Sequence, residues 1–249
     1  MPSTDLTGTI KDQSENRLGV LYLHALPLDE TMWVEQMDLH PNTYAPNLYA
    51  LGSGIEEWAK AAMETVQEDK VIVVGCSVGG SCAIEVALAY PDRVAALVLI
   101  GTKAGHKPNP EFHASAIQLL EQQGMEDAWQ TYWEPFFSAS TDRHVVEKAK
   151  AIAMQQGVGP VSLGTSVFHT RPCRDGALSS ITCPVSVVSG AEDIAPGIQK
   201  SREQADAMPN ASLHVIPNCG HYVSMEQPQA LNALLTQVID TEMAGLHHA

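Results

Sequence analysis

The residues with the clearest chemical potential are a serine and two glycines that follow an apolar run at residues 71–74. The sequence there reads Gly75-Cys76-Ser77-Val78-Gly79, a G-x-S-x-G pattern that is typical of a sharp turn from a strand into a helix. Glycines two residues before and after the serine let the strand and the helix pass close to each other. The pattern predicts that Ser77 presents a nucleophilic hydroxyl above a sheet, at the positive N-terminus of a helix.

A serine hydroxyl is a weak nucleophile at neutral pH, so it needs a base that accepts its proton. His221 is the leading candidate because it lies in a loop directly after the last predicted strand and before the C-terminal helix. The rivals are His24, His169 and His214, of which the last alternates within a predicted strand. We therefore expect His221 to act as the base.

An imidazole that accepts a proton becomes charged, and a carboxylate that orients the ring stabilises this charge. Asp193 is the preferred carboxylate because it follows the predicted strand at residues 184–189. Glu192 is adjacent in the sequence and Asp175 is nearby, so both stay open as alternatives. The three residues predict a Ser77, Asp193 and His221 catalytic constellation.

Attack on a carbonyl creates an oxyanion, which needs hydrogen-bond donors aimed at it. The backbone N–H of Val78 is one expected donor because this residue directly follows the nucleophile. The second should come from the loop at residues 23–27, where Leu26 is our choice. His24 in the same loop is better explained as a structural residue that hydrogen-bonds the loop.

Alternating strand and helix signals must position these residues. Continuous apolar runs, of the kind found in parallel sheets covered on both faces, predict strands at Gly19–Leu23, Val71–Val74, Ala95–Ile100, Pro184–Ser189 and Leu213–Ile216. Helical spacing of apolar residues predicts helices at about 54–67, with Ser53 and Glu56 as a capping box, at 78–90, and near the C-terminus. This order predicts an α/β fold with a mostly parallel, doubly wound sheet.

The alternation stops between residues 104 and 178, where helix signals occur without a convincing strand. We expect a core formed by residues 1–103 and 179–249 and a helical cap insertion at 104–178. The insertion holds all four phenylalanines and two of the four tryptophans. We expect its aromatic inner surface to cover a pocket, with the wall residues Trp129, Trp133, Phe136, Phe137 and Arg171.

Composition excludes several other classes of protein. The 249 residues carry 14 basic and 29 acidic side chains, a formal charge of −15, which disfavours binding to nucleic acid or to an anionic membrane surface. The absence of a long apolar run and of a signal peptide favours a cytoplasmic protein. The five cysteines are scattered, which predicts reduced thiols and no zinc site.

Four segments together resemble the α/β-hydrolase superfamily: residues 23–27 its oxyanion loop, 75–80 its nucleophile elbow, 190–196 its acid loop, and 220–228 its histidine loop. The order serine, aspartate, histidine is also that of the superfamily. Met32-Trp33 and Gln36, and the run from Arg171 to Asp175, are similar to esterases of the 3-oxoadipate enol-lactonase type. Two departures are Asn47, where the family usually has aspartate, and Ala25, which replaces the oxyanion-loop glycine.

The resemblance implies a serine hydrolase that cleaves small carboxylic esters or lactones through an acyl-enzyme, with no metal or organic cofactor. A carbon–carbon bond hydrolase or a perhydrolase with the same three residues is the alternative. A non-catalytic small-molecule binding protein on this fold is the alternative from another class. Arg171 could bind a substrate carboxylate, but a solvated or structural role is the favoured interpretation, so neutral short-acyl or aryl esters are the expected substrates. The oligomeric state is left open.

Overall fold

The computed structural model describes residues 18–247, which contain one six-stranded sheet with the order β2-β1-β3-β4-β5-β6. Every strand pairing is parallel. The strands are β1 (Leu18–Leu23), β2 (Thr43–Tyr44), β3 (Lys70–Cys76), β4 (Val94–Ile100), β5 (Val185–Gly190) and β6 (Ala211–Ile216). The expected α/β architecture is confirmed, and the sheet is parallel throughout the described residues.

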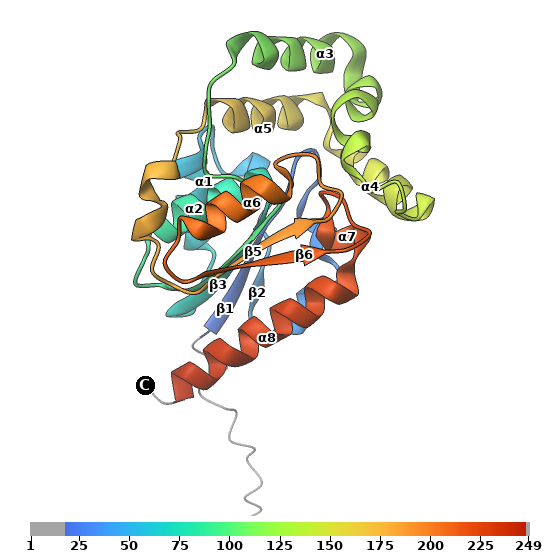
Figure 1. Ribbon diagram of the computed structural model, residues 1–249. Coiled ribbons are helices and arrows are strands. Elements are labelled where there is room, and N and C mark those ends of the chain that lie inside the picture. Colours follow the sequence, from blue (N-terminus) through green and yellow to red (C-terminus); the bar gives the residue numbers. More distant parts are fainter. Residues whose placement is uncertain (1–17, 248–249) are drawn as a thin grey trace, which may run out of the picture.

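Helices cover both faces of this sheet, which explains why its central strands read as continuous apolar runs. In Figure 1, α1 (Ile55–Glu64), α2 (Val78–Ala89) and α6 (Gly197–Asp206) lie on one side of the strands and α8 (Pro228–His247) on the other. The short helix α7 (Val223–Glu226) precedes α8. All residues of β1 are buried, whereas the edge strand β6 is only partly covered.

Two local details differ from the sequence interpretation. The expected capping box is wrong: Gly54 is the N-cap of α1, and the Glu57 carboxylate, rather than that of Glu56, accepts hydrogen bonds from Ser53. The two-residue strand β2 was not predicted, because a run this short has no readable periodicity.

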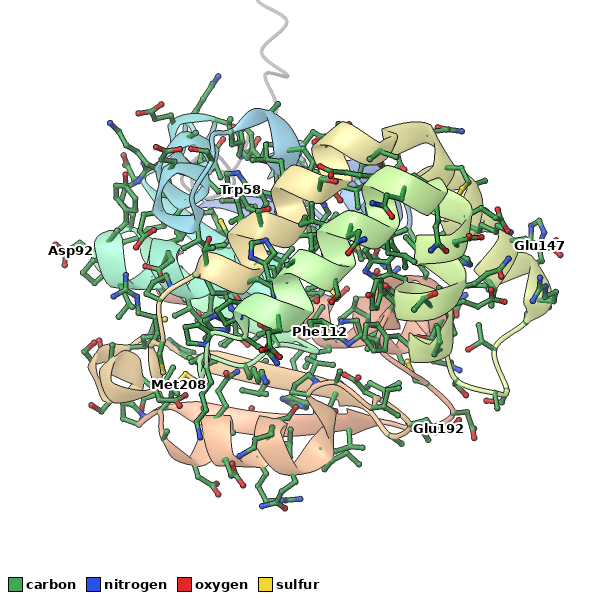
Figure 2. The ribbon with its side chains drawn as sticks, turned by 90° about the horizontal axis from the view of Figure 1, so that it is seen from above. Trp58, Asp92, Phe112, Glu147, Glu192 and Met208 are labelled. Carbon is green, nitrogen blue, oxygen red and sulfur yellow. The ribbon has the colours of Figure 1, made fainter. Side chains whose placement is uncertain are left out.

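The segment between β4 and β5 contains helices and no strand, as the sequence indicated. Its helices are α3 (Pro110–Ala128), which is interrupted by a non-helical Gly124, a π-helical turn (Trp129–Trp133), α4 (Arg143–Gln156) and α5 (Val158–Thr170). Figure 2 shows α3 and α5 side by side above the core, with Phe112 near the beginning of α3. No sequence signal had pointed to α5.

Five free cysteines, all within residues 18–247, agree with the prediction of unpaired thiols. Of the helices in this same range, none combines the length and the apolar character that a membrane crossing requires.

His24 illustrates how polar groups are satisfied inside this core. Its Nε2 lies 2.9 Å from the backbone N–H of Leu48, so Nε2 must accept, and the proton of the neutral ring is then on Nδ1, 3.2 Å from the carbonyl of Ala25. The side chain is fully buried. Burial lowers the pKa of His24 to about 4, so the ring is neutral at pH 7. The expected structural role of His24 is consistent with these contacts.

This buried neutral histidine predicts a loss of stability in acid. In the unfolded chain a histidine takes up a proton near pH 6.5, whereas folded His24 resists protonation until about pH 4, so stability falls as the pH drops from 6.5 towards 4. We expect His24 to lower the free energy of unfolding by about 2 kcal/mol between pH 7 and pH 5. Urea unfolding of the parent and of His24→Gln at both pH values measures this. An equal loss in both proteins would show that His24 does not contribute.

Candidate active site

The sequence-predicted site residues follow the carboxyl ends of four parallel strands. Leu26 follows β1, Ser77 follows β3, Asp193 follows β5 and His221 follows β6. Because the carboxyl ends of parallel strands meet at one edge of a sheet, residues up to 195 positions apart in the chain come together there.

Ser77 occupies a strained turn between β3 and α2. Its backbone has φ 56° and ψ −116°, a region that side-chain-bearing residues rarely adopt. A Cβ at Gly79 would lie 2.1 Å from the carbonyl oxygen of Leu23, and one at Gly75 would lie 2.3 Å from that of Gly79. The close passage of strand and helix that the glycine pattern predicted is thus present. Val78 is the first residue of α2, so its backbone N–H has no acceptor within the helix.

His221 is held by a buried carboxylate. Its Nδ1 lies 3.1 Å from both Oδ1 and Oδ2 of Asp193, and the side chains are 3% and 0% exposed. A carboxylate can only accept, so Nδ1 donates, and the Nε2 of a neutral ring is the free proton acceptor. Asp193 is itself fixed, because its Oδ1 also accepts the N–H of Ala195 at 2.8 Å.

The turn after β4 leaves no space beside this pair. Gly101 has φ +54°, and a Cβ built on it would lie 2.8 Å from Nδ1 of His221 and 3.2 Å from Oδ2 of Asp193. Both the backbone conformation and the close approach require glycine here.

Ser77 and His221 line one cavity of about 380 Å³, together with Leu26. This volume lies in the range of small-molecule sites. Leu26 also ties two loops together, because its carbonyl accepts the hydroxyl of Tyr222, the residue after His221, at 3.0 Å. The cavity therefore brings the serine, the histidine and the predicted oxyanion loop together.

The structure places only some of the predicted wall residues at the cavity. Trp133, Phe136 and Arg171 line the cavity, whereas Trp129 and Phe137 do not. Trp129 is fully buried and packs against Phe137, with ring centroids 5.9 Å apart. Phe137 in turn packs against the ring of Tyr222. Trp129 and Trp133 are the first and last residues of one π-helical turn, and of the two only Trp133 lines the cavity.

Aromatic residues that were not predicted complete the wall: Phe112 and Tyr132 from the α3 region, and Phe168 and His169 from α5. The helical spacing of α3 could have indicated Phe112. Phe168 and His169 carried no readable signal, because α5 itself was not recognised.

The alternative acids and bases have other partners. Glu192 accepts the hydroxyl of Ser138 at 2.7 Å, and Asp175 lies beside Cys173. His214 contacts Ser212 on the edge strand β6. His169 lines the cavity, but its ring contacts are with aromatic side chains, and burial lowers its pKa to about 4.

Cys76 directly precedes Ser77, and Cys219 lies two residues before His221. Both cysteines are packing residues. Both are fully buried, and burial raises the pKa of each thiol above its ordinary value. The Cys76 thiol lies 3.7 Å from the carbonyl of His221. Both sulfurs are therefore protonated at neutral pH and unsuited to nucleophilic attack.

Glu226 is an organising residue that the sequence interpretation missed. Its carboxylate accepts the backbone N–H groups of Gly220, Tyr222 and Ser138, at 2.9 Å each, and the hydroxyl of Thr141. It thus joins the histidine loop to the segment between β4 and β5. The available signal was a single acidic residue within the otherwise uncharged run at 219–229.

Known proteins resemble this chain in sequence and in fold. The pimeloyl-(acyl-carrier protein) methyl ester esterase of Aromatoleum aromaticum is 26% identical over 90% of this chain and 99% of that protein. A thermophilic esterase from Thermogutta terrifontis superposes with a TM-score of 0.84 at 24% identity, covering 91% of this chain and 90% of that one. The enol-lactonase from Burkholderia xenovorans LB400 gives a TM-score of 0.78 at 18% identity, covering 90% and 92%. At these identities the two structures show a shared fold.

The model of the alpha/beta hydrolase family matches residues 20–234, which include all four loops that carry the site. The chain belongs to the alpha/beta hydrolase family.

Proposed function

We propose that this chain is a serine hydrolase that cleaves small carboxylic esters or lactones through an acyl-enzyme. The observation that carries the proposal is the oriented imidazole: both oxygens of buried Asp193 hold Nδ1 of His221, which shares a cavity with the strained Ser77. Ser77 is the nucleophile, His221 the general base and Asp193 the orienting carboxylate.

In the first half of the reaction, the Ser77 hydroxyl transfers its proton to Nε2 of His221 as Oγ bonds to the carbonyl carbon. The electron pair of the C=O bond moves to oxygen, where the backbone N–H groups of Val78 and Leu26 stabilise the charge. When the C=O bond re-forms, the bond to the leaving oxygen breaks, and that oxygen takes the proton from His221.

In the second half, a water molecule transfers a proton to Nε2 of His221 while the water oxygen bonds to the acyl carbon. When the C=O bond re-forms, the bond between the acyl carbon and Oγ of Ser77 breaks, and Oγ takes the proton from His221. The products are a carboxylic acid and an alcohol, or one hydroxy acid when the substrate is a lactone. The helical segment 104–178, which we propose as a cap, supplies the aromatic part of the cavity wall.

A substrate panel with product identification tests the proposal. We expect turnover of 4-nitrophenyl acetate or 4-nitrophenyl butyrate to yield carboxylic acid and 4-nitrophenol in equal amounts, and turnover of an enol-lactone to yield a single oxo acid. Peracid formed when hydrogen peroxide is added would favour the perhydrolase, and cleavage of a vinylogous 1,5-diketone without ester turnover would favour the carbon–carbon hydrolase. Ligand binding without any turnover would contradict the proposal.

A further inference from the structure

The proposed catalytic cavity is electrostatically unlike the rest of the protein. The chain has twice as many acidic as basic residues, 29 against 14. Among the described residues that line the cavity, three are basic, namely Lys103, Arg171 and Lys200, and none is aspartate or glutamate. The same three also line a second cavity of about 610 Å³, whose lining includes Asp175 and Glu203. Lys103 and Lys200 are exposed, and Lys200 is paired with Glu203. Arg171 differs from both because it is buried.

In the part of the chain that the structure describes, Arg171 is a buried cation without a counterion. The residue is 5% exposed, and its Nε has no hydrogen-bond partner among residues 18–247. The guanidinium lies 3.9 Å from the ring centroid of Phe168 and donates to the carbonyl of that residue. Within residues 18–247, no carboxylate forms an ion pair with it. Burial lowers the pKa of Arg171 to about 10, so the group is charged at neutral pH.

Arg174, three residues later, is a useful comparison because its guanidinium is paired with carboxylates. Its Nε and Nη2 bond to the two oxygens of Glu85 at 2.7 and 2.9 Å, and Nη2 also contacts Glu56 at 3.2 Å. Both arginines follow α5, yet only Arg171 lacks acidic partners.

An unpaired charge in a protein interior is costly, and the Phe168 ring and the carbonyl end of α5 offset only part of this cost. The planar guanidinium matches a carboxylate through two parallel hydrogen bonds. Arg171 is one of the residues that line the cavity of Ser77 and His221. An anionic group on the substrate would therefore supply the missing counterion.

We propose that Arg171 binds a carboxylate of the substrate, at a position remote from the bond that is cleaved, with Lys103 and Lys200 attracting the anion. This inference rests on the proposed function. It differs from the sequence-based interpretation, in which Arg171 has a solvated or structural role and neutral esters are the expected substrates; of these, the solvated role is excluded by the burial of the residue. The substrate class is a half-ester, or an ester or lactone of a dicarboxylic or hydroxy acid, with one free carboxylate.

Pairs of substrates that differ in charge test the inference. Monomethyl glutarate and monomethyl adipate carry the carboxylate on the acyl side, with methyl hexanoate as the neutral comparator. For the alcohol side, 3-acetoxybenzoate is compared with 3-methylphenyl acetate. Acid release at constant pH gives kcat/KM for each. We expect the parent to prefer the anionic member of at least one pair by tenfold or more, and this ratio to fall as NaCl is raised from 20 to 500 mM.

Variants of Arg171 test whether this residue causes the preference for anionic substrates. Arg171→Gln removes a charge-assisted contact, so we expect the ratio of anionic to neutral kcat/KM to fall about 10- to 100-fold. Arg171→Lys keeps the charge without the paired geometry and should give an intermediate ratio. Arg143→Gln is the control, because Arg143 is an exposed arginine of α4 that pairs with Glu134 and Glu147 and lies outside the cavity. It should retain the parental ratio.

The salt dependence needs no variant, so the test survives if Arg171→Gln fails to fold. Equal turnover of anionic and neutral esters by the parent would overturn this inference and leave the proposed function intact. A preference that Arg171→Lys and Arg171→Gln both retain in full would overturn it as well. Absence of turnover with every substrate would overturn the proposed function, and the inference with it.

Discussion

Replacing Ser77 with alanine is expected to lower kcat at least about 10⁴-fold on any ester that the parent hydrolyses. The variant keeps the cavity, the oxyanion donors and the His221–Asp193 pair but has no atom that can form the acyl-enzyme. The methyl group of alanine replaces a hydroxymethyl group, so the fold should persist, although the positive φ of this residue stays strained. Steady-state rates with 4-nitrophenyl butyrate, with circular dichroism as a check of folding, measure the effect.

Ser81→Ala is the matched control, because Ser81 is a buried serine one turn further along α2. Its hydroxyl lies 3.5 Å from that of Thr102, and it does not line the cavity. We expect its kcat to remain within threefold of the parent. If Ser77→Ala kept more than a tenth of the parental rate, Ser77 would not be the nucleophile.

Replacing Asp193 with asparagine is expected to lower kcat about 10³- to 10⁴-fold while preserving shape. The asparagine amide can present an N–H to Nδ1 of His221, so the ring proton moves to Nε2. The nitrogen that should accept the Ser77 proton is then a donor, and the base is lost. His221→Ala should be at least as damaging, because it removes the base itself.

Glu192→Gln is the control for Asp193→Asn, because it makes the same chemical change on the adjacent carboxylate, whose partner is Ser138. We expect this variant to retain most of the parental activity. A larger loss of activity with Glu192→Gln than with Asp193→Asn would show that Asp193 is not the carboxylate that orients His221.

The sequence predicted the parts of this fold whose signals are local. The strands β3, β4 and β5 are continuous apolar runs, and only a sheet covered on both faces accommodates them. The turn around Ser77 was equally readable, because the spacing of Gly75 and Gly79 follows from backbone contact alone. The predicted convergence of His221 and Asp193 rested on the order of strands and on the family resemblance.

The features that could not be predicted depend on packing between distant segments. The helix α5 contains Gly159, Pro160 and Gly164, which weaken any helix signal, and packing against α3 stabilises it. A Cβ at Gly164 would lie 2.6 Å from the ring of Tyr49, so a tertiary contact requires this glycine.

The same limit applies to the cavity wall. Trp129 packs against Phe137 and Trp133 lines the cavity, a difference set by tertiary contacts that the sequence pattern does not indicate. The burial of Arg171, the basis of the proposed carboxylate site, likewise depends on how α5 meets the core.

The most direct test of the central claim is to identify the residue that a fluorophosphonate modifies. The reagent reacts with a serine that a neighbouring base activates, so mass spectrometry of peptides from the parent should place one adduct on Ser77. The Ser77→Ala protein should remain unmodified, and His221→Ala should react far more slowly. An adduct on another residue, or equally rapid modification of the Ser77→Ala protein, would contradict the assignment of Ser77 as the activated nucleophile.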